Sequence, residues 1–394
     1  MMNERLREAI GYFTRETQVM SDLAVACGQG DRLAWARDGE TVRAETLFDL
    51  ASVTKLFTGL CAMRLREEGK LDFRVKAAEM DPRFVHLRDV TVEQLISFRC
   101  NLQTPVRIDA CPDRERALAS LFAVKNSEAP ARRPYSDIPA MVLKYLLEAA
   151  AGEPLADCIR RTVLEKAGMR ETFARVPEER LCDCMSYEEE YRIEGARHIL
   201  RRDWKPGVPH DPKAAILQGD TGDLCGHAGL FSTLEDMIRL ARAILEEKII
   251  SRDSLREMAV NRTGRPLEEG GFSQYLGYLC YVRHPDQHFS EVPAYMGRQA
   301  FGMAGFTGNH FSVDPERGIF AVFLGNRVKR RLTVLLPEEG KTLTDYGLQE
   351  DGLGRIQRED GVTVPSSVHY VYQKDDHLHS VIAGVLGLET IPFL

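Results

Sequence analysis

Ser52 and Lys55 lie three positions apart in a segment with helical character. On a helix, residues i and i+3 are neighbours, so the lysine amine can lie beside the serine hydroxyl. A serine is a poor nucleophile at its ordinary pKa, but an adjacent amine whose pKa is lowered by burial or by another cation can accept its proton. The same spacing also occurs by chance on surface helices. The pair therefore predicts a nucleophile only together with its surroundings.

The surroundings of this pair support a catalytic interpretation. Residues 47–58 read LFDLASVTKLFT, and a second motif, Tyr135-Ser136-Asp137, follows 83 residues after Ser52. Together these segments resemble the serine β-lactamase and penicillin-binding-protein-like superfamily, in its class C β-lactamase and esterase branch. In that branch the tyrosine relays a proton between the nucleophile and the leaving group. The resemblance implies that Ser52, Lys55 and Tyr135 are catalytic and that Asp137 contacts the substrate.

A third pair of segments is similar to stretches that border the active-site mouth in this branch. They are residues 209–214 (PHDPKA) and 226–233 (GHAGLFST). His227 has the chemistry of a general base or a metal ligand, but the resemblance assigns it, with Ala228, to the wall of the substrate pocket. A metal site at His210 and Asp211 is the weaker alternative. We predict no metal and no cofactor, since no complete glycine motif for dinucleotides or phosphates is found.

A fourth segment departs from the family pattern. Family members carry Lys-Thr-Gly or His-Thr-Gly on the strand that faces the nucleophile, whereas this chain has Met303, Ala304 and Gly305. We expect all three to contact the substrate, and Gly305 to allow a close backbone approach. The resemblance implies an oxyanion hole formed by the N–H groups of Ser52 and Phe306, which survives changes of side chain. A substrate carboxylate would face the Met303 thioether, so we expect penicillins and D-Ala-D-Ala termini to be disfavoured.

The resulting hypothesis is a serine hydrolase that cleaves a small-molecule ester or amide through an acyl-Ser52 intermediate. One alternative is an acyltransferase, in which an alcohol or an amine intercepts the same acyl-enzyme. Another is a catalytically weakened ligand-binding homologue, which the loss of the Lys-Thr-Gly side chains suggests. A further departure, Phe98-Arg99 where the branch has His-Thr, indicates that substrate choice has changed near the pocket rim.

The elements that must position these residues follow from hydrophobic periodicity. Helical spacing predicts helices at both ends and through the middle of the chain, and alternation predicts strands near both ends. The expected helices are 4–16, 47–68, 139–151, a helix entered at 232–235, and 377–386. The expected strands are 23–26, 33–36, 276–282, 310–313 and 319–324. Residues 180–225 have a loop-like composition.

These elements predict an α/β (α+β) fold of the β-lactamase/transpeptidase type. An antiparallel sheet flanked by helices would be built from both termini, with an all-helical domain inserted. We expect one discontinuous domain at 1–75 and 271–394, a helical domain at 76–270, and a surface insertion at 336–365.

Composition excludes several classes of protein. The 394 residues include 52 Lys and Arg and 59 Asp and Glu, a net charge of −7, which argues against a nucleic-acid partner. Residues 1–20 carry charges throughout, so neither a signal peptide nor a membrane partner is expected. The nine scattered cysteines predict reduced thiols and a cytoplasmic protein. The oligomeric state stays open.

Overall fold

The computed structural model describes residues 2–129, 133–195, 197–351, 355–358, 361 and 363–393. Its main element is a six-stranded antiparallel sheet with the order β2-β1-β12-β11-β10-β9. β1 lies between β2 and β12, because Cys27 pairs with Ala34 on one side and with Ala321 on the other. The strands are β1 (Asp22–Gln29), β2 (Arg32–Gly39), β9 (Tyr281–Val282), β10 (Phe301–Gly305), β11 (Asn309–Asp314) and β12 (Ile319–Asn326).

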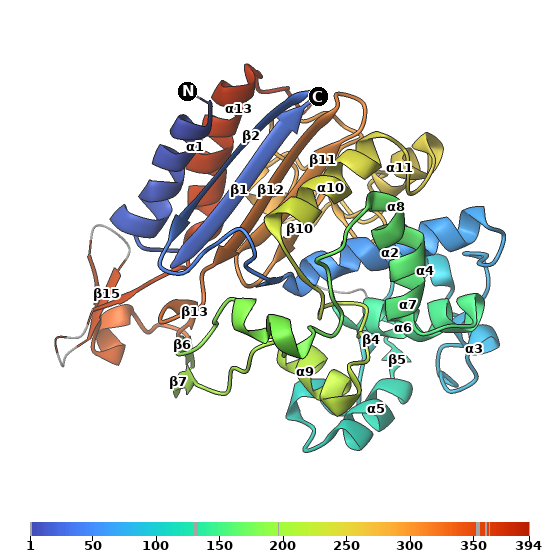
Figure 1. Cartoon of the computed structure of the whole chain (residues 1–394). Helices are drawn as coiled ribbons and strands as arrows, with labels where there is room; N and C mark the ends of the chain where they lie inside the picture. Colours follow the sequence, from blue (N-terminus) through green and yellow to red (C-terminus); the bar gives the residue numbers. More distant parts are fainter. Residues whose placement is uncertain are drawn as a thin grey trace.

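The two terminal helices, α1 (Met2–Gly11) and α13 (Ser380–Leu386), lie side by side over one face of this sheet (Figure 1). Their apolar stripes recur every three to four residues and pack on the strands. The buried residues they contribute are Leu6, Ile10, Ile382, Val385 and Leu386. The predicted N-terminal helix, the hairpin after it and the closing helix are confirmed.

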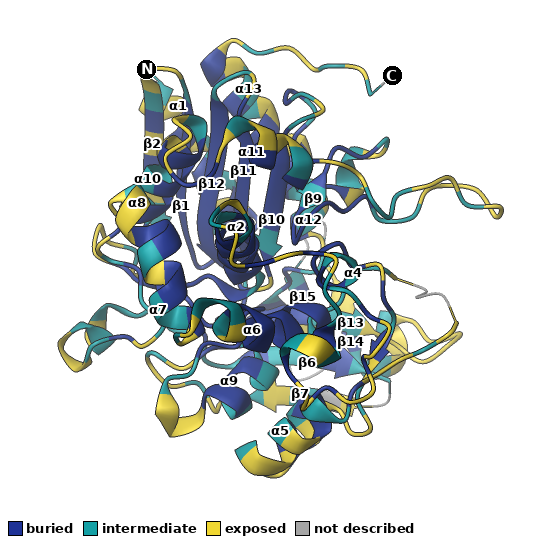
Figure 2. Ribbon diagram, turned by 90° about the vertical axis from the view of Figure 1, so that its right-hand side faces the viewer, coloured by how far each residue is buried: buried dark blue, intermediate teal, exposed yellow. Residues whose placement is uncertain are grey.

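The opposite face of the sheet is covered by α2 (Thr54–Glu67) and α10 (Leu234–Leu245). Of the 14 residues of α2, 11 are buried, so this helix runs inside the molecule rather than over its surface (Figure 2). A helix buried on nearly every side lies between packed layers. This burial brings Lys55 into the interior, next to the turn that carries Ser52.

Further helices lie between α2 and β9 (Figure 1). They are α3 (Ala77–Met80), α4 (Val92–Ile96), α5 (Arg114–Phe122), α6 (Ile138–Ala151), α7 (Leu155–Ile159), α8 (Glu165–Ala167), α9 (Pro212–Gln218) and α11 (Arg252–Met258); α12 (Tyr370–Gln373) precedes α13. Of these, α6 and α7 pack against α2, and α5 packs against α9. The prediction for α6 is confirmed, with Pro139 in its first turn and Gly152 as a left-handed C-cap at φ +73°. The predicted fold class, an antiparallel sheet with helices on both faces and an inserted helical region, is also confirmed.

The predicted helix over 47–68 is wrong at its start. Residues Phe48–Asp49 form a strand, β3, which pairs with β8 (Phe231–Ser232). α2 begins only at Thr54, so Ser52 lies in the turn that precedes it. The predicted strand at 276–282 is likewise shorter, because only β9 pairs with β10.

Two segments for which no strand was predicted contain strands. β6 (Glu190–Glu194) and β7 (Arg197–Arg201) lie within 180–225, and they form a second sheet with β13 (Leu332–Leu336). The segment 336–365 contains a third sheet, whose Leu348 and Ile356 pack on Ile193 and Leu332. The strands of this sheet are β14 (Leu348–Glu350), β15 (Arg355–Arg358) and β16 (Thr363–Pro365); β4 (Leu102–Gln103) pairs with β5 (Lys125–Asn126).

The inserted region is therefore not purely helical, and one of its hairpins pairs with a strand from the C-terminal part. The division into domains at residues 75 and 270 stays a prediction. Within the described ranges, no helix is both long and apolar enough to cross a bilayer.

Candidate active site

The turn that carries Ser52 bends sharply between β3 and α2. A 3-10 turn over Ala51–Val53 joins the two elements. Ala51 has a φ of +46°, a left-handed conformation that costs energy in a residue with a side chain. Ser52 is half-buried, so the turn presents its hydroxyl ahead of α2 rather than within it.

A buried carboxylate holds this turn. Asp49 accepts the N–H of Ala51 at 2.8 Å and the N–H of His210 at 2.6 Å, and burial raises its pKa. Its carbonyl oxygen accepts the Thr307 hydroxyl at 2.9 Å and the Asn309 amide at 2.7 Å. Asp49 thus ties the turn to β11 and to the loop before α9. No role was predicted for Asp49 from the sequence, although a charged residue within the apolar run 47–51 was a usable signal.

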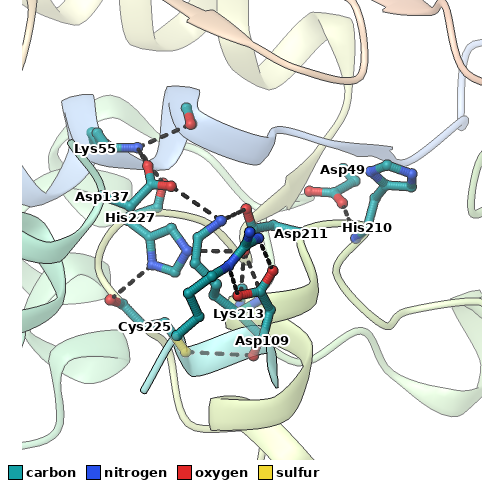
Figure 3. Close-up of polar contacts among 12 residues, drawn as sticks. Asp49, Lys55, Asp109, Asp137, His210, Asp211, Lys213, Cys225 and His227 are labelled. Carbon is teal, nitrogen blue, oxygen red and sulfur yellow. Dashed lines mark hydrogen bonds and ion pairs between the residues drawn. The ribbon is translucent and has the colours of Figure 1, made fainter. Parts of the chain in front are cut away.

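Lys55 is fully buried and makes three polar contacts at its Nζ atom (Figure 3). It donates to Ser52 Oγ at 2.9 Å, to Asp137 Oδ1 at 2.7 Å and to the carbonyl oxygen of His227 at 3.3 Å. Burial by itself lowers the pKa of Lys55, but the Asp137 carboxylate and Tyr135 outweigh it and hold that pKa above its ordinary value. The expectation of a depressed lysine pKa is therefore wrong, because Lys55 is held as an ammonium.

Tyr135 stands beside the lysine with its ring fixed on both faces. It is stacked between Phe98 and Tyr281, with centroid distances of 5.5 Å to each. The Lys55 Nζ atom lies 5.0 Å from the Tyr135 ring centroid. Phe98 is buried and has a φ of +57°, so a strained residue supports the tyrosine. Sequence analysis placed Phe98 only near the pocket rim, without this contact.

Two further charged residues continue the cluster beyond Asp137. The second oxygen of Asp137 lies 3.2 Å from Lys213 Nζ, which lies 3.0 Å from Asp211. Asp211 in turn faces His227 Nε2 at 3.1 Å and caps α9 through the N–H of Ala214. Burial raises the pKa of Asp137, but Lys55, His227 and Lys213 reverse this effect and lower it to about 2. The sequence pointed to Asp137 and His227 but gave Lys213 no role.

Three of these residues have the donor atoms of a metal site. One atom each from Asp137, Asp211 and His227 lies within 4.8 Å of the others. The Lys213 ammonium contacts both carboxylates, so a positive charge already occupies the place that a metal ion would take. His210, the other histidine considered, faces Glu190 instead, at 3.0 Å. The expectation of no metal stays a prediction.

The pocket in front of Ser52 has a volume of about 400 Å³ and a strongly charged lining. Its charged residues are Arg107, Asp109, Asp137, Arg192, Arg201, Asp211 and Lys213. Its remaining residues are Ala51, Ser52, Tyr135, His210, Pro212, Tyr281, Ala304 and Phe306. Four cationic side chains and three carboxylates therefore line this pocket.

The residues of β10 alternate between this pocket and the core. Ala304 and Phe306 line the pocket, whereas Met303 is fully buried in the core on the other face of the strand. The expectation that a substrate carboxylate faces the Met303 thioether is therefore wrong. Met303 gives no reason to expect that anionic substrates are disfavoured. His227, Ala228 and Gly305 are also buried, and among the described residues they are not part of the lining.

Gly305 lies where β10 passes closest to the Ser52 turn. A Cβ atom added there would lie 2.5 Å from the carbonyl oxygen of Leu50, so a backbone must move. We expect Gly305→Ala to lower the free energy of unfolding by about 1–3 kcal/mol in urea titrations. Gly384→Ala is the matched control, since its Cβ would meet only the flexible end of Arg5 at 3.0 Å. Equal losses in the two variants would contradict this explanation.

Comparisons with a family model and with curated proteins point to the same family. The family model described as Beta-lactamase matches residues 12–338. A Salmonella typhi protein named "Putative D-alanyl-D-alanine carboxypeptidase" is 24% identical over 352 residues, covering 80% of this chain and 79% of its own.

Solved structures agree in fold. EstCE1, titled a hydrolase with promiscuous acyltransferase activity, has a TM-score of 0.65 at 18% identity and covers 96% of this chain and 98% of its own. A class C β-lactamase has a TM-score of 0.61 at 15% identity and covers 82% of this chain and 91% of its own. The expected resemblance to the class C and esterase branch is confirmed at the level of fold.

Proposed function

The chain belongs to the Beta-lactamase family and to its serine hydrolases, and from this premise we propose that it cleaves a small ester or amide through an acyl-Ser52 intermediate. The observation that carries the proposal is the 2.9 Å contact between Lys55 Nζ and Ser52 Oγ at the wall of the charged pocket. A fixed cation beside a hydroxyl lowers the energy of the alkoxide that forms during attack.

Tyr135 relays the proton in this proposal. Lys55 already carries its full complement of protons, so it stabilises negative charge rather than accepting the proton of Ser52. As the bond from Ser52 Oγ to the carbonyl carbon forms, the Oγ proton passes to the Tyr135 oxygen, and the proton that the Tyr135 hydroxyl already carries passes to the leaving oxygen or nitrogen. The bond between that atom and the carbonyl carbon then breaks. Water attacks the acyl carbon by the same path in reverse and releases Ser52.

The negative charge on the carbonyl oxygen needs N–H donors. Ser52 directly follows the left-handed residue Ala51 in its turn, and Phe306 follows directly after the last ladder pair of β10, Gly305 with Asn309. We assign the oxyanion hole to the N–H groups of Ser52 and Phe306. Each such donor contributes about 10²- to 10³-fold to the rate of acyl transfer.

The pocket supports a substrate with both polar and aromatic character. The ring of Phe306, 38% exposed, is stacked on His210 at one end, and Tyr281 stacks on Tyr135 at the other. An acyl group or leaving group of modest size fits a space of about 400 Å³. We place the protein in the cytoplasm, which agrees with the nine free thiols among the described residues.

Acyl transfer is the second candidate. It uses the same acyl-enzyme, with an alcohol or an amine in place of water. The similarity to EstCE1, a hydrolase with promiscuous acyltransferase activity, favours this candidate. The distribution of products with and without an added primary alcohol distinguishes transfer from hydrolysis.

Covalent labelling tests the proposal. We expect a fluorophosphonate to add one phosphonyl group to Ser52, as found by intact mass and peptide mapping, and a short-chain p-nitrophenyl ester to be turned over. A folded protein that neither labels nor turns over any ester or anilide would contradict the proposal. That result would favour the weakened ligand-binding homologue instead.

A further inference from the structure

The polar groups around Lys55 form a closed ring (Figure 3). Starting at Lys55 Nζ, the contacts run to Asp137 at 2.7 Å, to Lys213 at 3.2 Å and to Asp211 at 3.0 Å. They continue to His227 Nε2 at 3.1 Å, and the ring closes because the His227 carbonyl oxygen accepts from Lys55 at 3.3 Å. The ring thus joins α2, which carries Lys55, to the loops before α6, α9 and α10.

Lys213 holds the central place in this ring. Its Nζ atom contacts one oxygen of Asp137 and one of Asp211, and its side chain is 25% exposed. Without it, two carboxylates whose oxygens lie within 4.8 Å would face each other without the cation that they share. Lys213 also lies in the wall of the pocket, next to the space for a substrate.

Asp137 transmits the effect of Lys213 to the nucleophile. One of its oxygens binds Lys213 and the other binds Lys55, which in turn contacts Ser52. The orientation of the Asp137 carboxylate therefore sets the position of the Lys55 ammonium.

We propose that Lys213 is a positioning residue of this site, whose ammonium keeps Asp137 ionised and aimed at Lys55 and so holds Lys55 against Ser52. This inference rests on the proposed function, because it concerns the readiness of Ser52 to react. The electrostatic effect of Lys213 supports the inference, since its charge contributes to lowering the pKa of both Asp137 and Asp211.

Other charged and titratable groups face the ring and stay in place when Lys213 is changed. Across the pocket they are Arg107, Asp109, Arg192, Arg201 and His210. Behind it they are Asp49, Tyr135, Cys225 and Tyr281. A change in pH dependence on mutating Lys213 therefore reports the loss of its own charge.

The test is the pH dependence of Ser52 reactivity in Lys213→Met. The rate constant of fluorophosphonate labelling and kcat/KM for a p-nitrophenyl ester are measured from about pH 2 to about pH 9. Removing the shared cation raises the pKa of Asp137. As the pH falls, Asp137 is then protonated, and stops binding the Lys55 ammonium, at a higher pH than in the wild type. We expect the acid half-point of both profiles to rise by about 1–3 pH units.

Two controls separate positioning from a general loss of stability. Lys213→Arg keeps the charge and is expected to return the half-point close to that of the wild type. Lys166→Met makes the same change at an exposed position on α8 and is expected to leave the profile unchanged. A purely structural role would lower the unfolding midpoint without moving the half-point.

A double variant covers the case in which Lys213→Met fails to fold. Lys213→Met/Asp211→Asn removes one charge of each sign, and the asparagine still caps α9. We expect its half-point to lie between those of the wild type and Lys213→Met, or simply above the wild type if the single variant is lost. A wild-type half-point in folded Lys213→Met, or in the double variant, would overturn the inference and leave the proposed function standing. A wild-type protein that does not label at Ser52 would overturn both.

Discussion

Ser52→Ala is expected to reduce ester turnover by about 10⁴- to 10⁶-fold, because the covalent route disappears with the hydroxyl. Any remaining rate would come from substrate binding and the N–H donors. The expected loss lies in kcat rather than in KM, because an alanine leaves the pocket lining intact. Fluorophosphonate labelling is expected to disappear in parallel.

The control for this variant is another serine of the same chain. Ser380→Ala removes an exposed hydroxyl at the start of α13, which donates to the carbonyl oxygen of Asp376 at 2.8 Å. We expect it to keep wild-type labelling and turnover. Labelling that persists in Ser52→Ala, with a modified peptide elsewhere, would show that another residue is the nucleophile.

Lys55→Met is expected to cost both stability and activity. Its ammonium is fully buried, and replacing it leaves the Asp137 carboxylate without its closest cation. Breaking a buried ion pair costs about 3–5 kcal/mol, and we expect the lower end because Asp137 keeps Lys213 and is 24% exposed. Turnover should fall by about 10²- to 10⁴-fold, the range expected when a positioned proton-transfer group is disturbed.

A second substitution separates the two effects. In Lys55→Met/Asp137→Asn the unpaired charge is removed, so we expect urea unfolding to recover much of the lost stability. Activity is not expected to return, because no cation then contacts Ser52 Oγ. Recovery of turnover in the double variant would show that Lys55 has no chemical role, and unchanged stability in the single variant would contradict the buried ion pair.

The sequence predicted which residues form the site better than it predicted their ionisation. Ser52, Lys55, Tyr135 and Asp137 were identified from two motifs, and the structure brings them together although 82 positions separate Lys55 from Asp137. The pKa of Lys55 was predicted in the wrong direction. That direction depends on a 2.7 Å distance to a carboxylate, which no spacing along the chain specifies.

The residues that line the pocket could not be predicted from local sequence patterns either. Met303 and Ala304 are adjacent in the chain, but the pleat of β10 sends one into the core and the other toward the pocket. Which of them faces the substrate follows from the register between β10 and β11 and from the position of the sheet. Lys213 appeared in the sequence as one charge among several, and its role in the ring arises only from the approach of three loops.

What the sequence by itself determined is the family, the fold class, the regular helices and the residue types that can carry out acyl transfer. Hydrophobic periodicity and closely spaced motifs are local properties, so they survive without coordinates. The tertiary structure alone decided the left-handed turn at Ala51, the protonated state of Lys55, the buried face of Met303, the small sheet formed by β13, β6 and β7, and the closed ring through Lys213. Each of these depends on groups that are distant in sequence and that meet only when the core is packed, because Coulomb interactions and hydrogen bonds act over a few ångströms.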